Sequence, residues 1–363
     1  MECNQALLEQ FQIAGRYIDI SELKRGHIHD TYVSRWNQGN LEASYVHQKL
    51  NRNVFADVPG VMGNVERVLA HLDSYKEKLN EVGDERRVRL IYAANGAPFF
   101  QAPDGTCWRT YEFVPRTTSF LICDDAKLAF DAARACGYFQ KSLCELRAED
   151  FTIVIPHFTD MEKRYEALQT AIEADVVNRV GHVEQELRSL MAHADSFGLV
   201  NRAIENHEIP ERVTHNDLKY NNVLFDKISK RAICVVDLDT CMSGSILYDY
   251  GDLLRTTATR AAEDEQDLSQ VLVDLEYLAA LTSGYLEPLA SVLTSKERDL
   301  LPIMPAFVTR MIGVRFLTDY IQGDKYFKTH YPDHNLVRAR SQFKLADEFK
   351  MYEEQIYKLL GAF

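Results

Sequence analysis

The chain has 363 residues, with 41 Lys and Arg against 54 Asp and Glu, and a formal net charge of -13. This acidic balance without basic runs argues against nucleic acid or an anionic membrane surface as a partner. We expect no signal peptide and no membrane span, because the first residues lack a basic flank and no apolar run approaches the length of a transmembrane helix. Seven cysteines without a C-x-x-C pair indicate reduced, mostly buried thiols in a cytoplasmic protein.

The first third of the chain shows short apolar runs that are separated by turn residues. This pattern predicts strands over 17–20, 31–36, 43–50, 87–93 and 108–114. One helix is predicted from Pro59 to about Lys78, because Val61, Val65 and Leu72 recur at helical spacing.

Beyond Pro115 the pattern becomes helical. Amphipathic helices are predicted over 128–146, 161–174 and 183–206, short strands near 211–237, and mostly helices from 252 onward. We therefore predict an α+β, protein-kinase-like fold with two lobes. The small β-rich N-lobe (1–115) would bind nucleotide, and the large helical C-lobe (116–363) would carry catalysis and the acceptor, with the nucleotide in the cleft between them.

A candidate phosphoryl-transfer motif consists of His215, Asp217 and Asn222, spaced H-x-D-x-x-x-x-N. A later apolar run, 233–236, ends on Asp237. Phosphoryl transfer needs a carboxylate at the acceptor hydroxyl and oxygen ligands for the magnesium on the nucleotide phosphates. We predict Asp217 as the catalytic base and acceptor contact, and Asn222 and Asp237 as magnesium ligands. The alternative is a surface turn at His215 and a strand-end cap at Asp237.

Two neighbours of Asp217 have their own predicted roles. His215 is predicted to be structural and to hold the loop by hydrogen bonds, because a histidine base would duplicate Asp217. Lys219 lies two residues after Asp217, where its ammonium group can reach the γ-phosphate and stabilise developing charge. The alternative for Lys219 is a solvated surface lysine.

Several segments carry a family resemblance. The catalytic segments 214–219 and 235–240 resemble the aminoglycoside phosphotransferase and choline kinase superfamily. Within it, the nearest resemblance is to the N-acetylhexosamine 1-kinase group, and it rests on segments 26–32, 51–55, 237–244, 311–320 and 323–327. The catalytic motif identifies only the superfamily, and the block from 311 to 327 indicates the subgroup.

The resemblance assigns nucleotide contacts to the loop around Gly26, and the predicted loop residues are Gly26, His27, Asp30 and Thr31. The family pattern has asparagine where this chain has His29, which leaves the contacts of that position open. One glycine is too few for a G-x-G-x-x-G cradle.

No lysine occupies the V-A-I-K position of protein kinases. Lys49 is the nearest candidate for the α- and β-phosphates, with Glu66 as its predicted ion-pair partner. Both residues are equally compatible with solvated charges.

Kinase-like folds offer main-chain groups to the adenine edge where the two lobes join, which here implies Glu112 and Val114. Asp249 fits the superfamily pattern G-x-x-x-Y-D, which implies a structural role: accepting hydrogen bonds from the catalytic loop backbone. Two roles stay open for Asp239: a group near the metal that does not bind it directly, or a strand-end cap.

The resemblance also implies that Arg315 and Tyr326 contact the acceptor. Arginine supplies several fixed hydrogen-bond donors, which suits sugar hydroxyls and an acyl group. The alternative for Arg315 is an ion pair with Asp319, one helical turn away.

The resemblance implies an ATP- and Mg²⁺-dependent kinase that phosphorylates the anomeric hydroxyl of N-acetylglucosamine or N-acetylgalactosamine, as a monomer or weak homo-oligomer. One alternative is a kinase for an aminoglycoside, choline or another sugar. The acidic patch Glu263–Asp267 keeps a cationic acceptor open. A nucleotide-binding pseudokinase is the other alternative, and the presence of Asp217, Asn222 and Asp237 argues against it.

Overall fold

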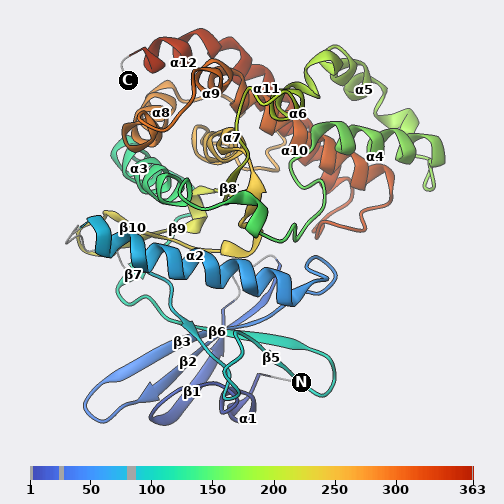
Figure 1. Cartoon of the computed structure of the whole chain (residues 1–363). Coiled ribbons are helices and arrows are strands. Elements are labelled where there is room, and N and C mark those ends of the chain that lie inside the picture. Colours follow the sequence, from blue (N-terminus) through green and yellow to red (C-terminus); the bar gives the residue numbers. More distant parts are fainter. Residues whose placement is uncertain (1–2, 24–27, 80–86, 362) are drawn as a thin grey trace. The chain divides into compact units, whose positions relative to one another are not determined.

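The computed structural model describes residues 3–23, 28–79, 87–361 and 363 (Figure 1). It divides into two compact units, and both are assembled from separate stretches of the chain. The first unit contains 1–118, 145–156 and 224–243, and the second contains 119–144, 157–223 and 244–363. Gly26 and His27, two of the predicted nucleotide-binding residues, lie outside the described residues.

The first unit contains an antiparallel sheet with the order β1-β2-β3-β6-β4, and β5 also pairs with β6. Gly39 makes the turn between β2 and β3 at φ +81, a backbone conformation that glycine adopts without a Cβ clash. The strands are β1 (Arg16–Glu22), β2 (Asp30–Asn37), β3 (Glu42–Lys49), β4 (Leu90–Ile91), β5 (Phe100–Gln101) and β6 (Cys107–Glu112).

Helices and small apolar clusters complete the first unit. The long helix α2 (Val58–Leu79) covers the whole range predicted for it, and the short α1 (Gln5–Leu8) places Leu7 and Leu8 in two separate clusters. One cluster contains Phe11 and Trp108, and the other contains Trp36 and Tyr45. A further small sheet contains β7 (Thr117–Thr118), β9 (Val223–Asp226) and β10 (Ala232–Val235).

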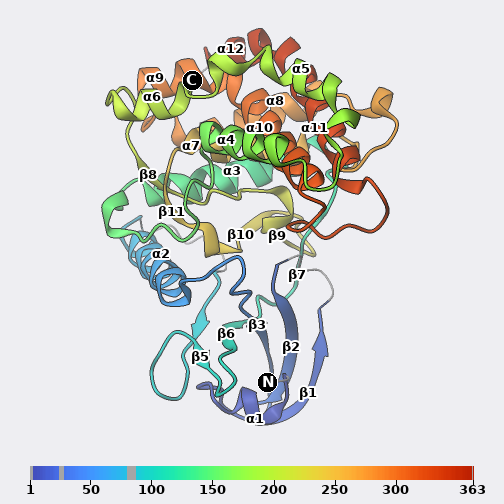
Figure 2. The ribbon, with the colours of Figure 1, turned by 90° about the vertical axis from the view of Figure 1, so that its right-hand side faces the viewer.

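The second unit is helical (Figure 2). Helix α3 packs along α8, and α10 packs against α11, α7 and α4. Thr294 begins α9 with a capping box, in which its hydroxyl accepts from the Glu297 N–H and the Glu297 carboxylate accepts from the Thr294 N–H. The helices are α3 (Ala126–Leu143), α4 (Met161–Ala174), α5 (Glu184–Met191), α6 (Leu199–Glu205), α7 (Ile246–Thr257), α8 (Leu275–Leu289), α9 (Ser295–Leu300), α10 (Met304–Ile321), α11 (His334–Met351) and α12 (Glu353–Leu360).

Two predictions from the sequence were wrong. The single helix expected over 183–206 is divided into α5 and α6 by a 3₁₀ turn at Ala194–Ser196. The expectation that no apolar run approaches the length of a membrane span also fails, because Ser295–Ile321 is long and apolar enough by composition. Its apolar window is 83% buried within the chain, as in the core helix of a globular unit. All seven cysteines are free, as predicted, and five of them are buried.

Candidate active site

The catalytic loop lies in the second unit, between β8 (Arg212–Thr214) and the 3₁₀ turn Tyr220–Asn222. The Lys219 Nζ lies 2.8 Å from the Asp217 Oδ1, and the Asn222 Nδ2 donates to the Asp217 carbonyl at 2.9 Å. The loop therefore holds all three predicted functional side chains around one tight turn. Asp217 keeps part of its side chain accessible to solvent, as a group that meets a substrate requires.

Asp249 holds this loop from the first turn of α7. Its carboxylate accepts the backbone N–H groups of His215 and Asn216 at 2.9 and 2.7 Å. Burial raises the pKa of the Asp249 carboxyl to about 7, although the neighbouring His215 and these N–H donors act in the opposite direction. The buried His215 ring meets Phe139 edge to face, and its Nδ1 accepts the Asp217 N–H at 3.3 Å. Asp249 and His215 thus both contact the backbone of the catalytic loop.

Gly244 permits a close approach of the backbone to the catalytic loop. A Cβ at this position would lie 2.4 Å from both the Asn216 Oδ1 and the Thr214 Oγ1. Such a distance is far below van der Waals contact, so any larger residue would displace these two side chains. The hydroxyl of Thr214 donates to the Asn216 Oδ1 at 3.0 Å, and that contact would be lost with them.

Lys219 stays protonated in this environment. Burial opposes its charge, but the carboxylates of Asp217 and Asp252 outweigh burial and raise the pKa of Lys219. Asp252 itself is paired with the Arg255 Nε at 2.7 Å. A protonated ammonium 2.8 Å from Asp217 is suited to stabilising negative charge on a transferring phosphoryl group.

Asn222 has the donor chemistry of a magnesium ligand. Its Nδ2 donates to the Asp217 carbonyl, and the amide also carries an oxygen, the ligand atom that suits a hard cation. The described residues contain no cluster of three or more His, Cys, Asp or Glu that could hold a metal by itself.

Asp237, the other predicted metal ligand, lies in the first unit after β10. It has a left-handed backbone, with φ 67 and ψ 55, and precedes the 3₁₀ turn Leu238–Thr240. Its side chain does not cap that 3₁₀ turn. A non-glycine residue in this conformation is uncommon and is found preferentially at functional sites.

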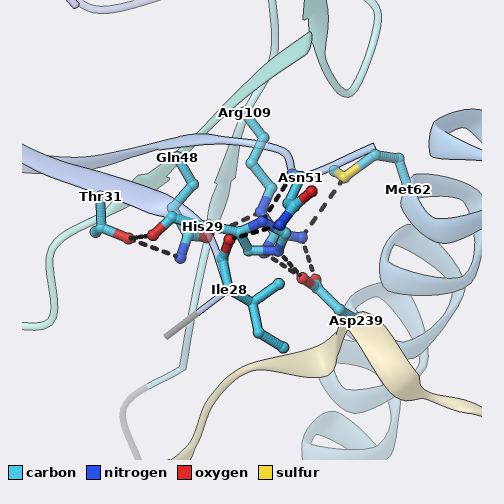
Figure 3. Close-up of polar contacts among 8 residues, drawn as sticks. All are labelled: Ile28, His29, Thr31, Gln48, Asn51, Met62, Arg109 and Asp239. Carbon is cyan, nitrogen blue, oxygen red and sulfur yellow. Dashed lines mark hydrogen bonds and ion pairs between the residues drawn. The ribbon is translucent and has the colours of Figure 1, made fainter. Parts of the chain in front are cut away.

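A buried polar network is centred on Asp239, two residues after Asp237, and lies within the first unit (Figure 3). The Arg109 guanidinium, from β6, binds both carboxylate oxygens, with Nη2 2.8 Å from Oδ2. The His29 Nε2 lies 2.6 Å from the same Oδ2. Burial alone would raise the pKa of Asp239, but Arg109 and then His29 outweigh it and lower that pKa. Asp239 is thus a structural anchor held by two partners.

Hydrogen bonds fix the tautomer that we assign to His29. Its Nδ1 accepts the Asn51 N–H at 3.0 Å, so the proton of a neutral ring is on Nε2 and is donated to Asp239. Arg109 also donates from Nε to the Gln48 Oε1 at 2.9 Å. His29, at the position where the family pattern has asparagine, therefore joins the segment before β2 to the segment that follows Asp237.

The predicted phosphate-contacting residues have other partners. Lys49 lies opposite Asp30 in the β2–β3 pair, with 4.0 Å between its Nζ and the Asp30 Oδ2. Among the contacts of the described residues, the predicted ion pair between Lys49 and Glu66 is absent, and Tyr92 hydrogen-bonds to Glu66 instead. Lys49 pairs with Asp30 because the register of β2 and β3 places the two residues opposite each other. The Thr31 Oγ1 accepts a weak contact from Gln48 Nε2 at 3.4 Å.

The predicted adenine-contacting residues lie at and just after the end of β6. The Glu112 N–H donates to the Arg89 carbonyl at 2.8 Å, and the Val114 carbonyl accepts the Thr117 hydroxyl at 2.7 Å. These two main-chain groups are therefore used within the fold. A nucleotide would have to use other main-chain groups of this stretch.

The predicted acceptor residues lie around the C-terminal end of α10 in the second unit. Asp319 accepts the backbone N–H groups of Lys325, Tyr326 and Phe327 at 2.8 to 2.9 Å. The alternative pairing of Arg315 with Asp319 is thus absent among the described residues, because the loop backbone takes that carboxylate. The guanidinium of Arg315 lies instead 5.1 and 5.6 Å from the ring centroids of Phe158 and Phe327.

Tyr326 is exposed, and its ring meets Phe327 edge to face at 4.8 Å. Asp319 fixes the backbone of both residues, and Asn335 Nδ2 donates to the same carboxylate at 2.9 Å. The loop that presents Tyr326 is therefore tied to α10 and α11 rather than loosely attached.

The acidic patch Glu263–Asp267 is largely used for internal contacts. Glu263 pairs with the Arg255 Nη1 at 3.0 Å, and Asp264 accepts from His334 Nε2 and the Tyr331 hydroxyl at 3.0 and 3.2 Å. Asp267 accepts the Ser269 N–H at 3.0 Å. The patch thus connects helices of the second unit, and this weakens the argument for a cationic acceptor there.

Sequence reasoning missed Arg109, Arg164 and Phe158. Arg109 offered one signal, since a charged residue between Trp108 and Thr110 in an apolar strand requires a buried partner. Its partner Asp239 lies 130 residues away and could not be identified from spacing. Arg164 and Phe158 carried no local signal.

The chain matches the family model described as the phosphotransferase enzyme family over residues 50–282. The solved structure of an aminoglycoside phosphotransferase from Alicyclobacillus acidocaldarius is similar over 100% of this chain and 98% of that chain, with 13% identity and a TM-score of 0.62. An ethanolamine kinase from Plasmodium vivax is 12% identical, covers 94% of this chain and 84% of its own, and gives a TM-score of 0.58.

A spectinomycin phosphotransferase, solved in complex with ADP and spectinomycin, is 11% identical with a TM-score of 0.56 and 93% coverage of both chains. Identities this low show a common fold. They confirm the predicted α+β, kinase-like fold, with a β-sheet region toward the N-terminus and a helical C-terminal part.

Proposed function

The chain belongs to the phosphotransferase enzyme family, and we propose that it transfers the terminal phosphoryl group of ATP to the anomeric hydroxyl of an N-acetylhexosamine, giving the 1-phosphate. The observation that carries the phosphotransferase part is the catalytic loop. It places the Asp217 carboxylate 2.8 Å from a protonated Lys219 and fixes its backbone through Asp249.

In this proposal Asp217 aligns the acceptor hydroxyl and takes its proton. Phosphoryl transfer needs positioning and charge stabilisation more than covalent chemistry, so one oriented carboxylate is sufficient. Lys219 stabilises the charge that develops on the phosphoryl oxygens. Asp249, by holding the N–H groups of His215 and Asn216, keeps Asp217 in position.

Asn222 and Asp237 are the proposed magnesium ligands. Both present oxygen, the ligand atom that Mg²⁺ prefers. The metal would neutralise charge on the nucleotide phosphates. Thr31, Asp30 and Lys49, with Gly26 and His27, remain proposed nucleotide contacts, and Glu112 and Val114 remain proposed main-chain contacts to the base.

Two observations support an uncharged or anionic acceptor over a cationic one. Among the described residues Arg315 has no ion-pair partner within 4 Å and contacts only the rings of Phe158 and Phe327, so its guanidinium donors are available to sugar hydroxyls or an acetamido oxygen. The acidic patch that a cationic aminoglycoside or choline would use is occupied by Arg255, His334 and Tyr331. These contacts favour the sugar over the cationic alternatives.

The catalytic part is tested by Asp217→Asn. We expect turnover to fall roughly 10²–10⁴-fold, the usual contribution of a positioned acid or base, while the thermal melting midpoint stays close to that of the wild type. Steady-state kinetics with ATP and N-acetylglucosamine measures the loss. Asp299→Asn, at an exposed position on α9, is the matched control. Turnover of Asp217→Asn within a few-fold of the wild type would remove Asp217 from the mechanism.

The acceptor part is tested by the product. Phosphorus–proton coupling at the anomeric carbon, measured by NMR, distinguishes a 1-phosphate from a 6-phosphate. A parallel comparison of kcat/KM for N-acetylhexosamines, choline and an aminoglycoside should show the N-acetylhexosamine as the best acceptor. A preference for choline or the aminoglycoside would reject the acceptor and leave the phosphotransferase activity in place.

A further inference from the structure

Two arginines in the second unit lie beside each other on neighbouring helices. Arg164 belongs to α4 and Arg315 to α10, and these helices pack together (Figures 1 and 2). Both contact the same residue: the Arg164 Nη2 donates to the Phe158 carbonyl at 3.1 Å, and the Arg315 guanidinium lies 5.1 Å from the Phe158 ring centroid. Two positive charges therefore border Phe158.

Neither arginine has an anionic partner at ion-pair distance. Within the described part of the chain, no carboxylate oxygen lies within 4 Å of either guanidinium, and the acidic residues one helical turn away, Asp160 and Asp319, are bound elsewhere. Asp319, one turn after Arg315, accepts three backbone N–H groups. Asp160, one turn before Arg164, caps α4 through the Lys163 N–H at 3.1 Å and accepts from Asn201 at 2.9 Å.

Holding the Arg164 and Arg315 guanidinium groups next to each other without an anion costs free energy. Burial and then the charge of Arg315 lower the pKa of Arg164 to about 10, so the two like charges oppose each other. The Arg164 Nε is buried and has no hydrogen-bond acceptor. The faces of Phe158 and Phe327 give Arg315 partial compensation, since aromatic faces attract cations. An oxyanion would compensate both charges, because guanidinium groups bind carboxylate and phosphate through several donors.

We propose that Arg164 and Arg315 form a binding site for an anionic group, a carboxylate or a phosphate, on the acceptor. Phe158 and Phe327 flank Arg315, and Asp319 fixes the loop that carries Phe327. This proposal rests on the proposed function in placing the acceptor at Arg315. It names the substrate class as an acidic derivative of the N-acetylhexosamine, phosphorylated at its anomeric hydroxyl while its anionic substituent contacts the arginine pair.

A kinetic comparison tests the preference. The substrates are N-acetylglucosamine, its 6-phosphate and its 6-carboxylate, the uronic acid, which separate phosphate from carboxylate recognition. The wild type should prefer one of the acidic sugars over the neutral sugar by about tenfold or more in kcat/KM, since a charged hydrogen bond contributes roughly 1.5–3 kcal/mol and each 1.4 kcal/mol is tenfold.

Variants of the two arginines test whether they cause the preference for acidic sugars. Arg164→Met should lower the acidic-to-neutral ratio about tenfold and leave the KM for ATP unchanged, whereas Arg164→Lys, which keeps the charge, should retain most of it. Arg188→Met is the matched control, because Arg188 on α5 is exposed and its ion-pair partner is Glu184, one turn away. A ratio near one in the wild type, or the same ratio in Arg164→Met, would overturn the proposal.

A second measurement does not depend on catalysis. The melting midpoint is recorded in sodium sulfate and in sodium chloride at equal ionic strength, because sulfate mimics the anion and also stabilises proteins non-specifically. The additional sulfate shift should be saturable in the wild type and in Arg188→Met, and it should be reduced in Arg164→Met and Arg315→Met. If no sugar is phosphorylated but this difference appears, the acceptor assignment fails and the anion site stands. Equal sulfate shifts in all four proteins reject the anion site.

Discussion

Two charged clusters in this protein contrast in how their charges are compensated. Around Asp239 in the first unit, the carboxylate is bound by both Arg109 and His29, and each partner has further hydrogen bonds. Around Arg164 and Arg315 in the second unit, the described residues offer the two guanidinium groups only aromatic faces and one backbone carbonyl. A fully compensated cluster has no need of a ligand, whereas an uncompensated one gains most from binding one.

Both clusters lie next to residues with a proposed functional role. Their position in the chain therefore does not show which cluster is structural and which binds a ligand. Asp239 follows Asp237 by two residues, and Arg315 is itself a proposed acceptor contact. The two clusters differ in the partners of their charged groups. We expect the Asp239 cluster to determine stability and the arginine pair to determine binding, and the following variants test that division.

The largest expected effect is that of Arg109→Met. It leaves the buried Asp239 carboxylate without its main partner, and breaking a buried pair in this way costs about 3–5 kcal/mol of unfolding free energy. Chemical denaturation at neutral pH measures the loss, and Arg188→Met should change it by less than about 0.5 kcal/mol. The double variant Arg109→Met with Asp239→Asn should cost less than the sum of the single variants. Additive losses would mean that the two residues act independently.

A smaller effect is expected from pH. The folded pKa of Asp239 lies below its ordinary value of 3.8, so its contribution to stability is present above about pH 4 and is lost as the pH falls further. The difference in unfolding free energy between the wild type and Asp239→Asn should therefore be largest near neutral pH and shrink below about pH 4. Denaturation curves at several acidic pH values measure it. If this difference in unfolding free energy stayed constant at acidic pH, the charge of Asp239 would not be the source of the stabilisation.

The smallest effect on stability is expected from Arg164→Met. The change removes an unpaired, half-buried charge and one hydrogen bond to a carbonyl, so the unfolding free energy should stay within about 0.5 kcal/mol of the wild type or rise. The same denaturation experiment measures it. A loss of more than about 2 kcal/mol would place Arg164 among the structural residues, and the contrast between the two clusters would fail.

Local patterns predicted the regular elements well. Helix α4 runs over Met161–Ala174, the predicted range, because Asp160 caps its start and its apolar spacing is unbroken. The three long strands of the first unit were also recognised from alternation and the turn around Gly39. The break between α5 and α6 was missed because apolar residues recur on both sides of it. Gly198, beside α6, is packed so closely that a Cβ would lie 2.3 Å from the Glu162 Oε1, which is a tertiary constraint.

The side-chain partners of the candidate site were less predictable. The sequence permitted Arg315 to pair with Asp319, since they are one turn apart, but three N–H groups of the loop after α10 compete for that carboxylate. The same holds for Lys49 and Glu66, where strand register decided the outcome. Spacing along the chain identifies which pairs are within reach. The folded backbone decides which of them form.

The left-handed backbone of Asp237 limits how this position can change during evolution. At φ 67, most side chains would strain the chain, while glycine and asparagine adopt such a conformation readily. A descendant that no longer required the carboxylate would therefore be expected to drift toward Gly or Asn here, and only rarely toward Ala or a β-branched residue. Within a set of related sequences, Asn or Gly at this position would mark lineages in which the proposed metal-binding carboxylate was lost while the fold was retained.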